Sequence, residues 1–373
     1  MLVRVAAYFL SLALVFASPA MADTIRFAQF NASMNRAEAG ALAAALAAGD
    51  DPQILQVVAA IRAADPDVIL INEFDYAPGN GALFNEMYLG GDYAHVFIAP
   101  SNTGVATGLD LNGDGEVGAA SFALANDAFG FGTFPGQYGM VILSKFPLGA
   151  ARTFQEFRWK DMPGARQPMN PDGTPYYNAE AWEIFRLSSK SHWAVPVEVA
   201  GRTIWALAAH PTPPVFDGPE DRNGRRNADE IRLVADIAAG ADYVYDDAGV
   251  AGGLPEGASF VIMGDMNSDP FDGDSLPGAT DPLLAAGLTN VSVTPEGPGG
   301  LAAAADGVNP EHQGNPAQDT AAFNPDGPGN LRVDYVLPSA DLEIVGAAVL
   351  WPEAAEWLAA SDHRLVWVDI ALD

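Results

Sequence analysis

Residues that can bind a metal ion or transfer a proton recur where short apolar runs of this chain end. Asn31 follows the first run, Glu73 closes the second, and His210 closes the run 203–209. The second half of the chain adds a Gly-Asp-x-Asn segment and two more acidic positions, giving Asp265, Asn267, Asp334 and the dipeptide Asp362-His363. Carboxylates, amides and imidazoles without sulfur suit a hard cation such as Mg²⁺, Mn²⁺ or Ca²⁺.

Each of these features also has a purely structural explanation. An Asn after a strand is usually a turn residue, a Glu that closes an apolar run often marks the surface, and Gly-Asp-x-Asn is a common turn sequence. The ordered recurrence of all of them at strand ends favours a site over chance.

The elements that position these residues form an α/β pattern. We expect strands over 24–30, 67–73, 140–143, 203–209, 259–263, 331–337 and 365–372. A helix begins at Asp51-Pro52, carries one apolar stripe from Ile54 to Ile61, and ends at Asp65-Pro66; a second covers 228–237. Strands that alternate with helices indicate layered α/β structure, in which ligands bind where strand ends meet.

Composition excludes several classes of protein. The 373 residues include 48 acids, 18 bases and no cysteine, for a net charge of −30. Disulfide frameworks, zinc–thiolate sites and thiol nucleophiles are therefore excluded. The net charge also disfavours nucleic-acid and anionic-lipid partners, because like charges repel within a Debye length. A small phosphate ester held by a metal ion stays compatible with it.

The first segment predicts export. Arg4 precedes the apolar run 5–17, and Ala20-Met21-Ala22 supplies small residues for cleavage before Asp23. We expect a signal peptide over 1–22 and a secreted or periplasmic mature chain without a transmembrane segment. Residues 23–373 are expected to form one domain and to act as a monomer. Insertions are expected near 101–136, 161–178 and 271–330, the last one as a long loop without regular structure.

In this order, Asn31, Glu73, His210, Gly-Asp265-x-Asn267, Asp334-Tyr-Val-Leu and Ser-Asp362-His363 resemble the motifs of the endonuclease/exonuclease/phosphatase superfamily, the DNase I-like fold. The segment 137–147, with Gly139 and Ser144-Lys145-Phe-Pro147, is similar to that family's strand and turn. The resemblance covers 24–370. It implies a four-layer α/β sandwich with two packed sheets flanked by helices, and metal-dependent phosphoester hydrolysis.

The resemblance also implies roles for the individual residues. Glu73 would be the main metal ligand, with Asn31 and Asp362 close to the same ion, which we expect to be Mg²⁺ or Mn²⁺. Asp265 would orient or deprotonate the attacking water, and Asn267 would hold a phosphate oxygen. The remaining three are expected to act on protons and charge: Asp334 pairs with His363, and His210 binds the phosphate or assists the leaving oxygen.

Positive charge is scarce and local. Arg222, Arg225 and Arg226 precede the second helix and could clamp a phosphate, although pairing with neighbouring acids at a solvated helix start explains them equally well. Arg166 marks a second candidate substrate loop.

One acidic turn resembles a calcium loop. Asp110, Asn112, Asp114 and Glu116 alternate as oxygen ligands around Gly115, but position twelve is Ser121 rather than Glu. A structural Ca²⁺ site and a plain acidic turn are both open.

The leading hypothesis is a secreted, divalent-metal phosphoesterase. An extracellular nuclease of the same fold is the nearest alternative. A sphingomyelinase-like lipid phosphodiesterase would need an exposed apolar hairpin, for which 129–134 is a candidate, and a non-catalytic calcium-dependent binding module is the fourth.

Overall fold

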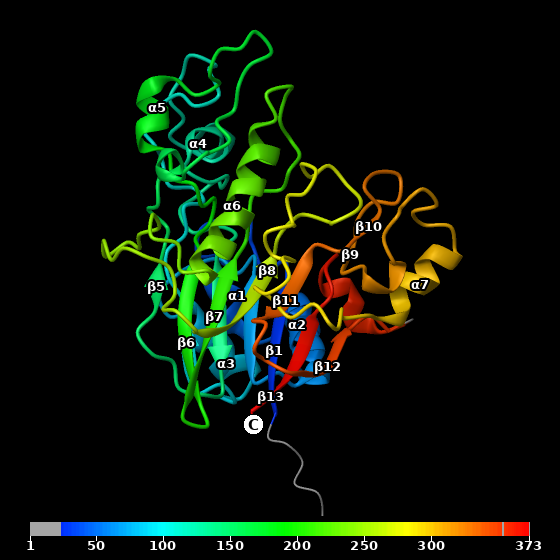
Figure 1. Cartoon of the computed structure of the whole chain (residues 1–373). Coiled ribbons are helices and arrows are strands. Elements are labelled where there is room, and N and C mark those ends of the chain that lie inside the picture. Colours follow the sequence, from blue (N-terminus) through cyan, green and yellow to red (C-terminus); the bar gives the residue numbers. More distant parts are fainter. Residues whose placement is uncertain (1–23, 353, 373) are drawn as a thin grey trace, which may run out of the picture.

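The computed structural model describes residues 24–352 and 354–372, so the expected signal peptide lies outside the described residues. Two sheets form its centre (Figure 1). The first has the order β12 (Ile344–Val349), β13 (Val366–Ala371), β1 (Thr24–Asn31), β2 (Val68–Asn72), β4 (Met140–Ser144), β3 (His95–Phe97). The second has the order β11 (Asp334–Pro338), β8 (Ser259–Asp265), β7 (Arg202–Ala209), β6 (Trp193–Val199), β5 (Arg152–Thr153).

Each sheet is mixed, and each contains one parallel pair. β1 runs parallel to β2, and β7 runs parallel to β8. The apolar runs predicted these strands well: β2, expected to lie inside a sheet, is buried over all its residues. The expected strand 331–337 is divided, because Asn330–Leu331 pairs as β10 with β9 (Ala321–Ala322), and β11 starts only at Asp334.

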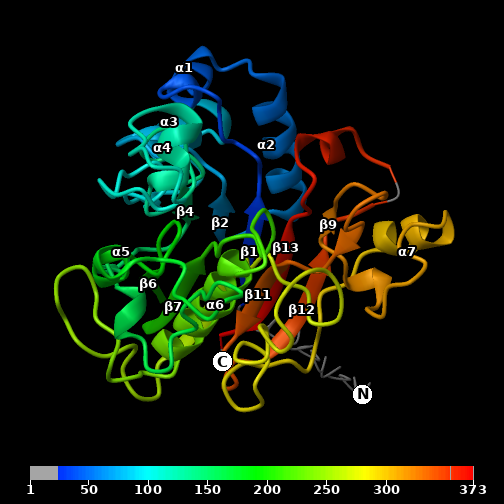
Figure 2. The ribbon, with the colours of Figure 1, turned by 90° about the horizontal axis from the view of Figure 1, so that it is seen from above.

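The two sheets face each other across an apolar core that includes Phe27, Ile142, Val195 and Met263. Helices α1 (Ala41–Ala48), α2 (Pro52–Ala64) and α3 (Asn80–Tyr88) cover the outer face of the first sheet, and α6 (Arg222–Ala238) covers that of the second. Figure 2 shows the two sheets between these helices. The chain is therefore a four-layer α/β sandwich, as expected.

Local sequence explains the ends of the main helices. Asp51 caps α2 by accepting hydrogen bonds from the amides of Gln53 and Ile54, and Pro52 occupies the first helical position. The prediction for α6 was too short, because this helix starts at Arg222 rather than at Ala228. The arginine cluster therefore forms the first turns of the helix and does not precede it.

The segments expected as insertions lie outside the two sheets. Residues 101–136 carry α4 (Ser121–Asp127), and α5 (Ala179–Ile184) directly follows 161–178; Figure 1 shows both helices above one end of the second sheet. The stretch 271–330 was expected to lack regular structure, but it contains α7 (Pro298–Ala305), a 3₁₀ turn at Pro316–Gln318 and the β9–β10 pair. Two more 3₁₀ turns lie at Trp159–Asp161 and Glu356–Ala360. Within the described ranges, no helix is both long and apolar enough to cross a membrane.

Candidate active site

Strand register brings the expected polar residues to one end of the sandwich. Asn31 pairs with Asn72, which precedes Glu73, and Asp334 pairs with Asp265 across β11 and β8. A pocket of about 800 Å³ opens at this end. Its wall includes six of the expected catalytic and metal-binding residues: Glu73, His210, Asp265, Asn267, Asp362 and His363. Asn31 and Asp334 lie buried directly behind that wall.

Glu73 holds its carboxylate at the pocket through two amide donors. Asn31 Nδ2 donates to Oε1 at 3.2 Å, and Asn35 Nδ2 donates to Oε2 at 2.7 Å. The backbone of Glu73 has φ 58°, in the left-handed region that few residues other than glycine adopt. Such strain at the end of a strand is typical of residues held in place for function.

Asp265 is the most heavily bonded acid of the site. Its Oδ2 accepts a hydrogen bond from Asn31 Nδ2 at 3.0 Å and lies 3.4 Å from His210 Nε2 and 3.7 Å from His363 Nε2. Its Oδ1 accepts from the amide of Asn267 at 2.8 Å. These donors fix both oxygens of a fully buried carboxylate.

Asp334 and His363 form a buried ion pair. His363 Nδ1 lies 2.8 Å from Asp334 Oδ2, and the other oxygen of Asp334 accepts from Gln29 Nε2 at 3.0 Å. Since Nδ1 is engaged by Asp334, Nε2 of His363 faces Asp265 and the pocket. The expected Asp334–His363 contact is thus present.

The charges of the site follow from burial and pairing. Burial alone would lower the pKa of His363, but the carboxylates of Asp334 and Asp265 outweigh it and raise the pKa to about 10. Burial raises the pKa of Asp334 to about 6, against the opposing charge of His363. Burial acts in the same direction on Asp265, yet His363 and His210 hold its pKa well below the usual range. At neutral pH His363 is therefore charged and both acids are ionised.

His210 has the opposite character. Burial and the nearby charge of Lys190 lower its pKa, so the imidazole is neutral at pH 7. Its Nδ1 is buried and has no hydrogen-bond partner among the described residues. Next to it, Asn267 takes a left-handed backbone, φ 52°, and its Nδ2 donates to the carbonyl of Pro211 at 3.1 Å.

The donor set fits a hard divalent cation at Glu73. Glu73 offers carboxylate oxygens at the pocket wall, Asn31 and Asn35 surround them, and the half-exposed carboxylate of Asp362 lies 4.0 Å from His363 Nε2. A second group, Asp265, Asp334 and His363, places ligand atoms within 4.8 Å of one another. In that group His363 lies between two acids and keeps its proton, so we assign it to charge stabilisation and not to metal binding.

The arginines expected as a phosphate clamp, Arg222, Arg225 and Arg226, and Arg166 of the second candidate loop all have partners within the protein. Arg166 pairs with the buried Asp229 and does not line the pocket. Arg222 lines the pocket but pairs with Glu220, and Arg225 donates to the carbonyl of Glu220.

Arg226 is also a pocket residue whose donors are used internally. Its guanidinium binds the backbone carbonyls of Leu187, Phe129 and Arg186. These hydrogen bonds link α6 to the two loops that contain these carbonyls.

The polar groups of the calcium-like loop form hydrogen bonds with one another. Asp110 accepts from the amides of Gly113 at 2.7 Å and Gly115 at 2.8 Å, and Asn112 Nδ2 donates to Asp114 Oδ2 at 3.0 Å. The amide of Glu116 donates to the other oxygen of Asp114 at 2.9 Å. A plain acidic turn accounts for these contacts, and calcium binding there stays a prediction.

Sequence reasoning missed four polar residues of the site. Gln29 lies two positions before Asn31 on the same face of β1, and Asn72 accepts from Gln29 at 2.8 Å and from the amide of Asp265 at 3.2 Å. A polar residue inside an apolar strand was the available signal for both. Asn35 gave no such signal, and Lys190 gave only the rarity of lysine.

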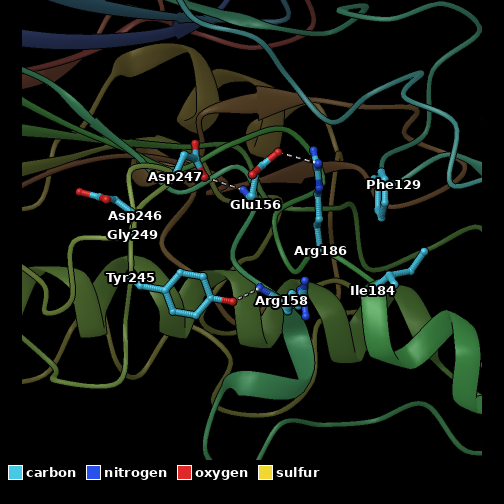
Figure 3. Close-up of a pocket in the computed structure, with 9 residues that line it drawn as sticks. All are labelled: Phe129, Glu156, Arg158, Ile184, Arg186, Tyr245, Asp246, Asp247 and Gly249. Carbon is cyan, nitrogen blue, oxygen red and sulfur yellow. Dashed lines mark hydrogen bonds and ion pairs between the residues drawn. The ribbon is translucent and has the colours of Figure 1, made fainter.

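A second cavity of about 370 Å³ lies apart from this site (Figure 3). Its charges are matched by neighbours: Arg186 pairs with Glu156 at 2.8 Å, and the amide of Glu156 donates to Asp247 at 2.7 Å. The amide of Arg158 donates a hydrogen bond to Tyr245 Oη at 3.2 Å. None of the expected catalytic or metal-binding residues lines it.

The family model described as endonuclease/exonuclease/phosphatase family matches residues 28–363. The chain belongs to this family, whose members are generally divalent-metal-dependent phosphoester hydrolases.

One solved structure shows the same fold, and two others are reported with it. An endonuclease/exonuclease/phosphatase from Beutenbergia cavernae DSM 12333 aligns with TM-score 0.54 at 17% identity, over 94% of this chain and 72% of that one. Sphingomyelinase C from Streptomyces griseocarneus aligns with TM-score 0.49 at 14% identity, over 93% and 99%. A mannosyl-6-phosphatase from Bacteroides thetaiotaomicron VPI-5482 aligns with TM-score 0.47 at 11% identity, over 93% and 99%. No curated protein sequence matches the chain.

Proposed function

We propose that this protein is an exported phosphoesterase that hydrolyses small phosphate esters with a divalent cation, Mg²⁺ or Mn²⁺, at Glu73. The observation that carries the proposal is the convergence of Glu73, Asp265 and the Asp334–His363 pair on one pocket. Export rests on the N-terminal sequence alone.

Glu73, Asn31 and Asp362 would hold the cation. When bound, it would polarise a phosphoryl oxygen and neutralise part of its charge. The hydrogen bonds from Asn31 and Asn35 fix the direction of the Glu73 carboxylate, and no cysteine competes as a ligand.

Asp265 would orient the attacking water. Its lowered pKa makes it a weak base, so it serves better as a fixed hydrogen-bond acceptor than as a strong proton acceptor. Asn31, His210 and the amide of Asn267 donate to its two oxygens, so that water bound to it takes one direction. Of the two roles expected from the sequence, orientation is therefore the better supported.

His363 would stabilise the charge that develops on the phosphoryl group. It carries its proton at neutral pH, and Asp334 directs Nε2 towards the pocket. A preorganised charged donor of this kind stabilises a transition state without reorganisation. The Asn267 amide adds a donor on the same wall, and neutral His210 directs its single N–H towards Asp265.

The pocket favours a small organic ester over a nucleic acid. Phe131 and Phe216, which are 50% and 86% exposed, line it together with Tyr176 and give the leaving alcohol an apolar wall. The arginines of the expected clamp, Arg222, Arg225 and Arg226, have internal partners, and the net charge of −30 opposes a polyanion.

Turnover of p-nitrophenyl phosphate, bis(p-nitrophenyl) phosphate and plasmid DNA tests the proposal. Each is assayed with Mg²⁺, Mn²⁺, Ca²⁺ or chelator, for the wild type and Glu73→Gln. We expect chelator-sensitive turnover of small esters that Glu73→Gln strongly reduces at the Mg²⁺ concentration sufficient for the wild type, while its melting curve stays cooperative. Fast DNA nicking with little ester turnover would favour the nuclease alternative. Partner binding without any turnover would favour a binding module.

A further inference from the structure

Lys190 is a buried lysine in the active-site pocket without a carboxylate partner. Lys145 pairs with Asp65 and Asp67, and Lys160 pairs with Glu183. Lys190 is only 7% exposed and forms no salt bridge with any described residue. Its Nζ donates one long hydrogen bond, 3.4 Å, to the carbonyl of Pro211. Burial lowers the pKa of Lys190, while the carboxylates of Glu230, Glu73 and Asp265 act in the opposite direction without contacting it, so the ammonium group has no direct anionic partner.

The segment around Lys190 is rigid. The fully buried carboxylate of Glu230 accepts from the amides of Ser189 at 2.5 Å and Thr212 at 2.6 Å. The carbonyl of Lys190 accepts from the amide of Asn102 at 2.8 Å. The backbone is therefore held on both sides of Lys190, and its side chain lies at the pocket wall.

Two other polar residues of the pocket share its surroundings. Asn267 Nδ2 donates to the same Pro211 carbonyl as Lys190 Nζ, at 3.1 Å. His210, the residue before Pro211, lines the pocket as well, and the positive charge of Lys190 acts on its imidazole. Lys190 and Asn267 thus place two donor nitrogens around one point of the wall, beside His210, where an anion would accept hydrogen bonds from both.

We propose that Lys190, beside the expected phosphate ligand Asn267, binds the terminal phosphoryl oxygens of the substrate, and that its ammonium group selects phosphomonoesters over diesters. This inference rests on the proposed function. A monoester carries two negative charges at neutral pH and a diester only one. Its second charge therefore interacts directly with a buried ammonium group, whereas a diester places an esterified, uncharged oxygen there.

The test compares wild type, Lys190→Met, Lys190→Arg and the control Lys145→Met. Lys145 follows Ser144, at the opposite end of β4 from the residue that pairs with Asn72. Lys190→Met keeps the chain length but removes the charge, and Lys190→Arg keeps the charge. With Mg²⁺ present, kcat/KM is measured for p-nitrophenyl phosphate and bis(p-nitrophenyl) phosphate, and binding of inorganic phosphate is measured by calorimetry.

We expect Lys190→Met to lose about 100-fold in kcat/KM for the monoester and under about 5-fold for the diester, with phosphate binding weakened at least about 10-fold. Lys190→Arg should keep part of the monoester preference, and Lys145→Met should behave like wild type. Equal losses on both esters, or unchanged phosphate binding, would overturn the inference.

The outcomes also separate this inference from the proposed function. Phosphate binding that Lys190→Met abolishes, in a protein that hydrolyses neither ester, would support the subsite and refute the proposed activity. If the wild type is active and Lys190→Met keeps the same monoester preference, the proposed activity would be supported and the subsite refuted. If Lys190→Met does not melt cooperatively, Lys190→Gln takes its place, with the same losses expected.

Discussion

The strand-end site and the arginine-rich start of α6 differ in how their charges are used. At the strand ends, Glu73 and Asp265 are held by amide and imidazole donors and face the pocket. At α6, Arg222 pairs with Glu220, and the guanidinium of Arg226 donates to backbone carbonyls. The first region keeps charge available for a substrate, and the second uses charge to hold loops together.

This difference shows that residue type alone does not identify a binding group. A guanidinium with internal partners must break them before it can bind phosphate, whereas a preorganised carboxylate is ready to act. The following predictions sharpen the contrast, from the largest expected effect to the smallest.

Asp265→Asn should have the largest effect. It removes the negative charge that orients water and also places an amide opposite the donors Asn31 and His210. We expect kcat/KM for a small ester to fall by about 10³-fold or more. Steady-state kinetics measure it, and a loss below about 10-fold would contradict the role of Asp265.

Glu73→Gln should come next and should act through the cation. We expect the Mg²⁺ concentration at half-maximal rate to rise by at least about 100-fold. The matched variant Glu220→Gln, which changes an acid of the arginine region, should leave this concentration unchanged. A shift of equal size in both variants would show that general surface charge, and not Glu73, sets metal affinity.

Asp334→Asn should change the pH dependence. The pKa of His363 in the folded protein is raised to about 10. In the unfolded chain, the same imidazole loses its proton near the ordinary pKa of histidine. The stabilisation is complete below about pH 6.5 and is lost as pH rises towards 10. Without the Asp334 carboxylate, the alkaline loss of kcat and of melting temperature should both start at lower pH. Unchanged pH profiles would contradict the pairing.

Arg166→Ala should affect stability but not turnover. Asp229 is fully buried and also accepts a hydrogen bond from Trp159 Nε1 at 2.7 Å. The variant removes the ion pair between Arg166 and this buried carboxylate. We expect about 1–3 kcal/mol lower free energy of unfolding, measured in denaturant, with kcat/KM within about twofold. A large rise in KM at unchanged stability would return Arg166 to the substrate site.

Arg225→Ala should have the smallest effect. Its single bond goes to the carbonyl of Glu220, and it does not line the pocket. Both kcat/KM and melting temperature should stay close to wild type. A marked loss of DNA cleavage in this variant would revive the nuclease alternative.

The sequence predicted the parts of the fold that local pattern determines. The apolar runs gave β1, β2, β4, β7, β8 and β13, and the Asp51-Pro52 and Asp65-Pro66 signals gave both ends of α2. The polar residues that follow these strands meet because neighbouring strands end in register.

The remaining features depend on tertiary contacts that no local pattern records. The alanine-rich α1 lacks an amphipathic stripe, and α6 extends back to Arg222 because its polar first turns pack against loops. Lys190 resembles any serine-flanked lysine in the sequence. Only the fold shows that it is buried beside His210.

The most direct test of the account is one comparison of kcat/KM for p-nitrophenyl phosphate, with Mg²⁺ and with chelator. Wild type, Asp265→Asn and Arg166→Ala are assayed together. We predict chelator-sensitive turnover that Asp265→Asn abolishes and Arg166→Ala retains. Full activity of Asp265→Asn, or loss of activity in a stably folded Arg166→Ala, would contradict the claim that the chemistry resides at the strand ends.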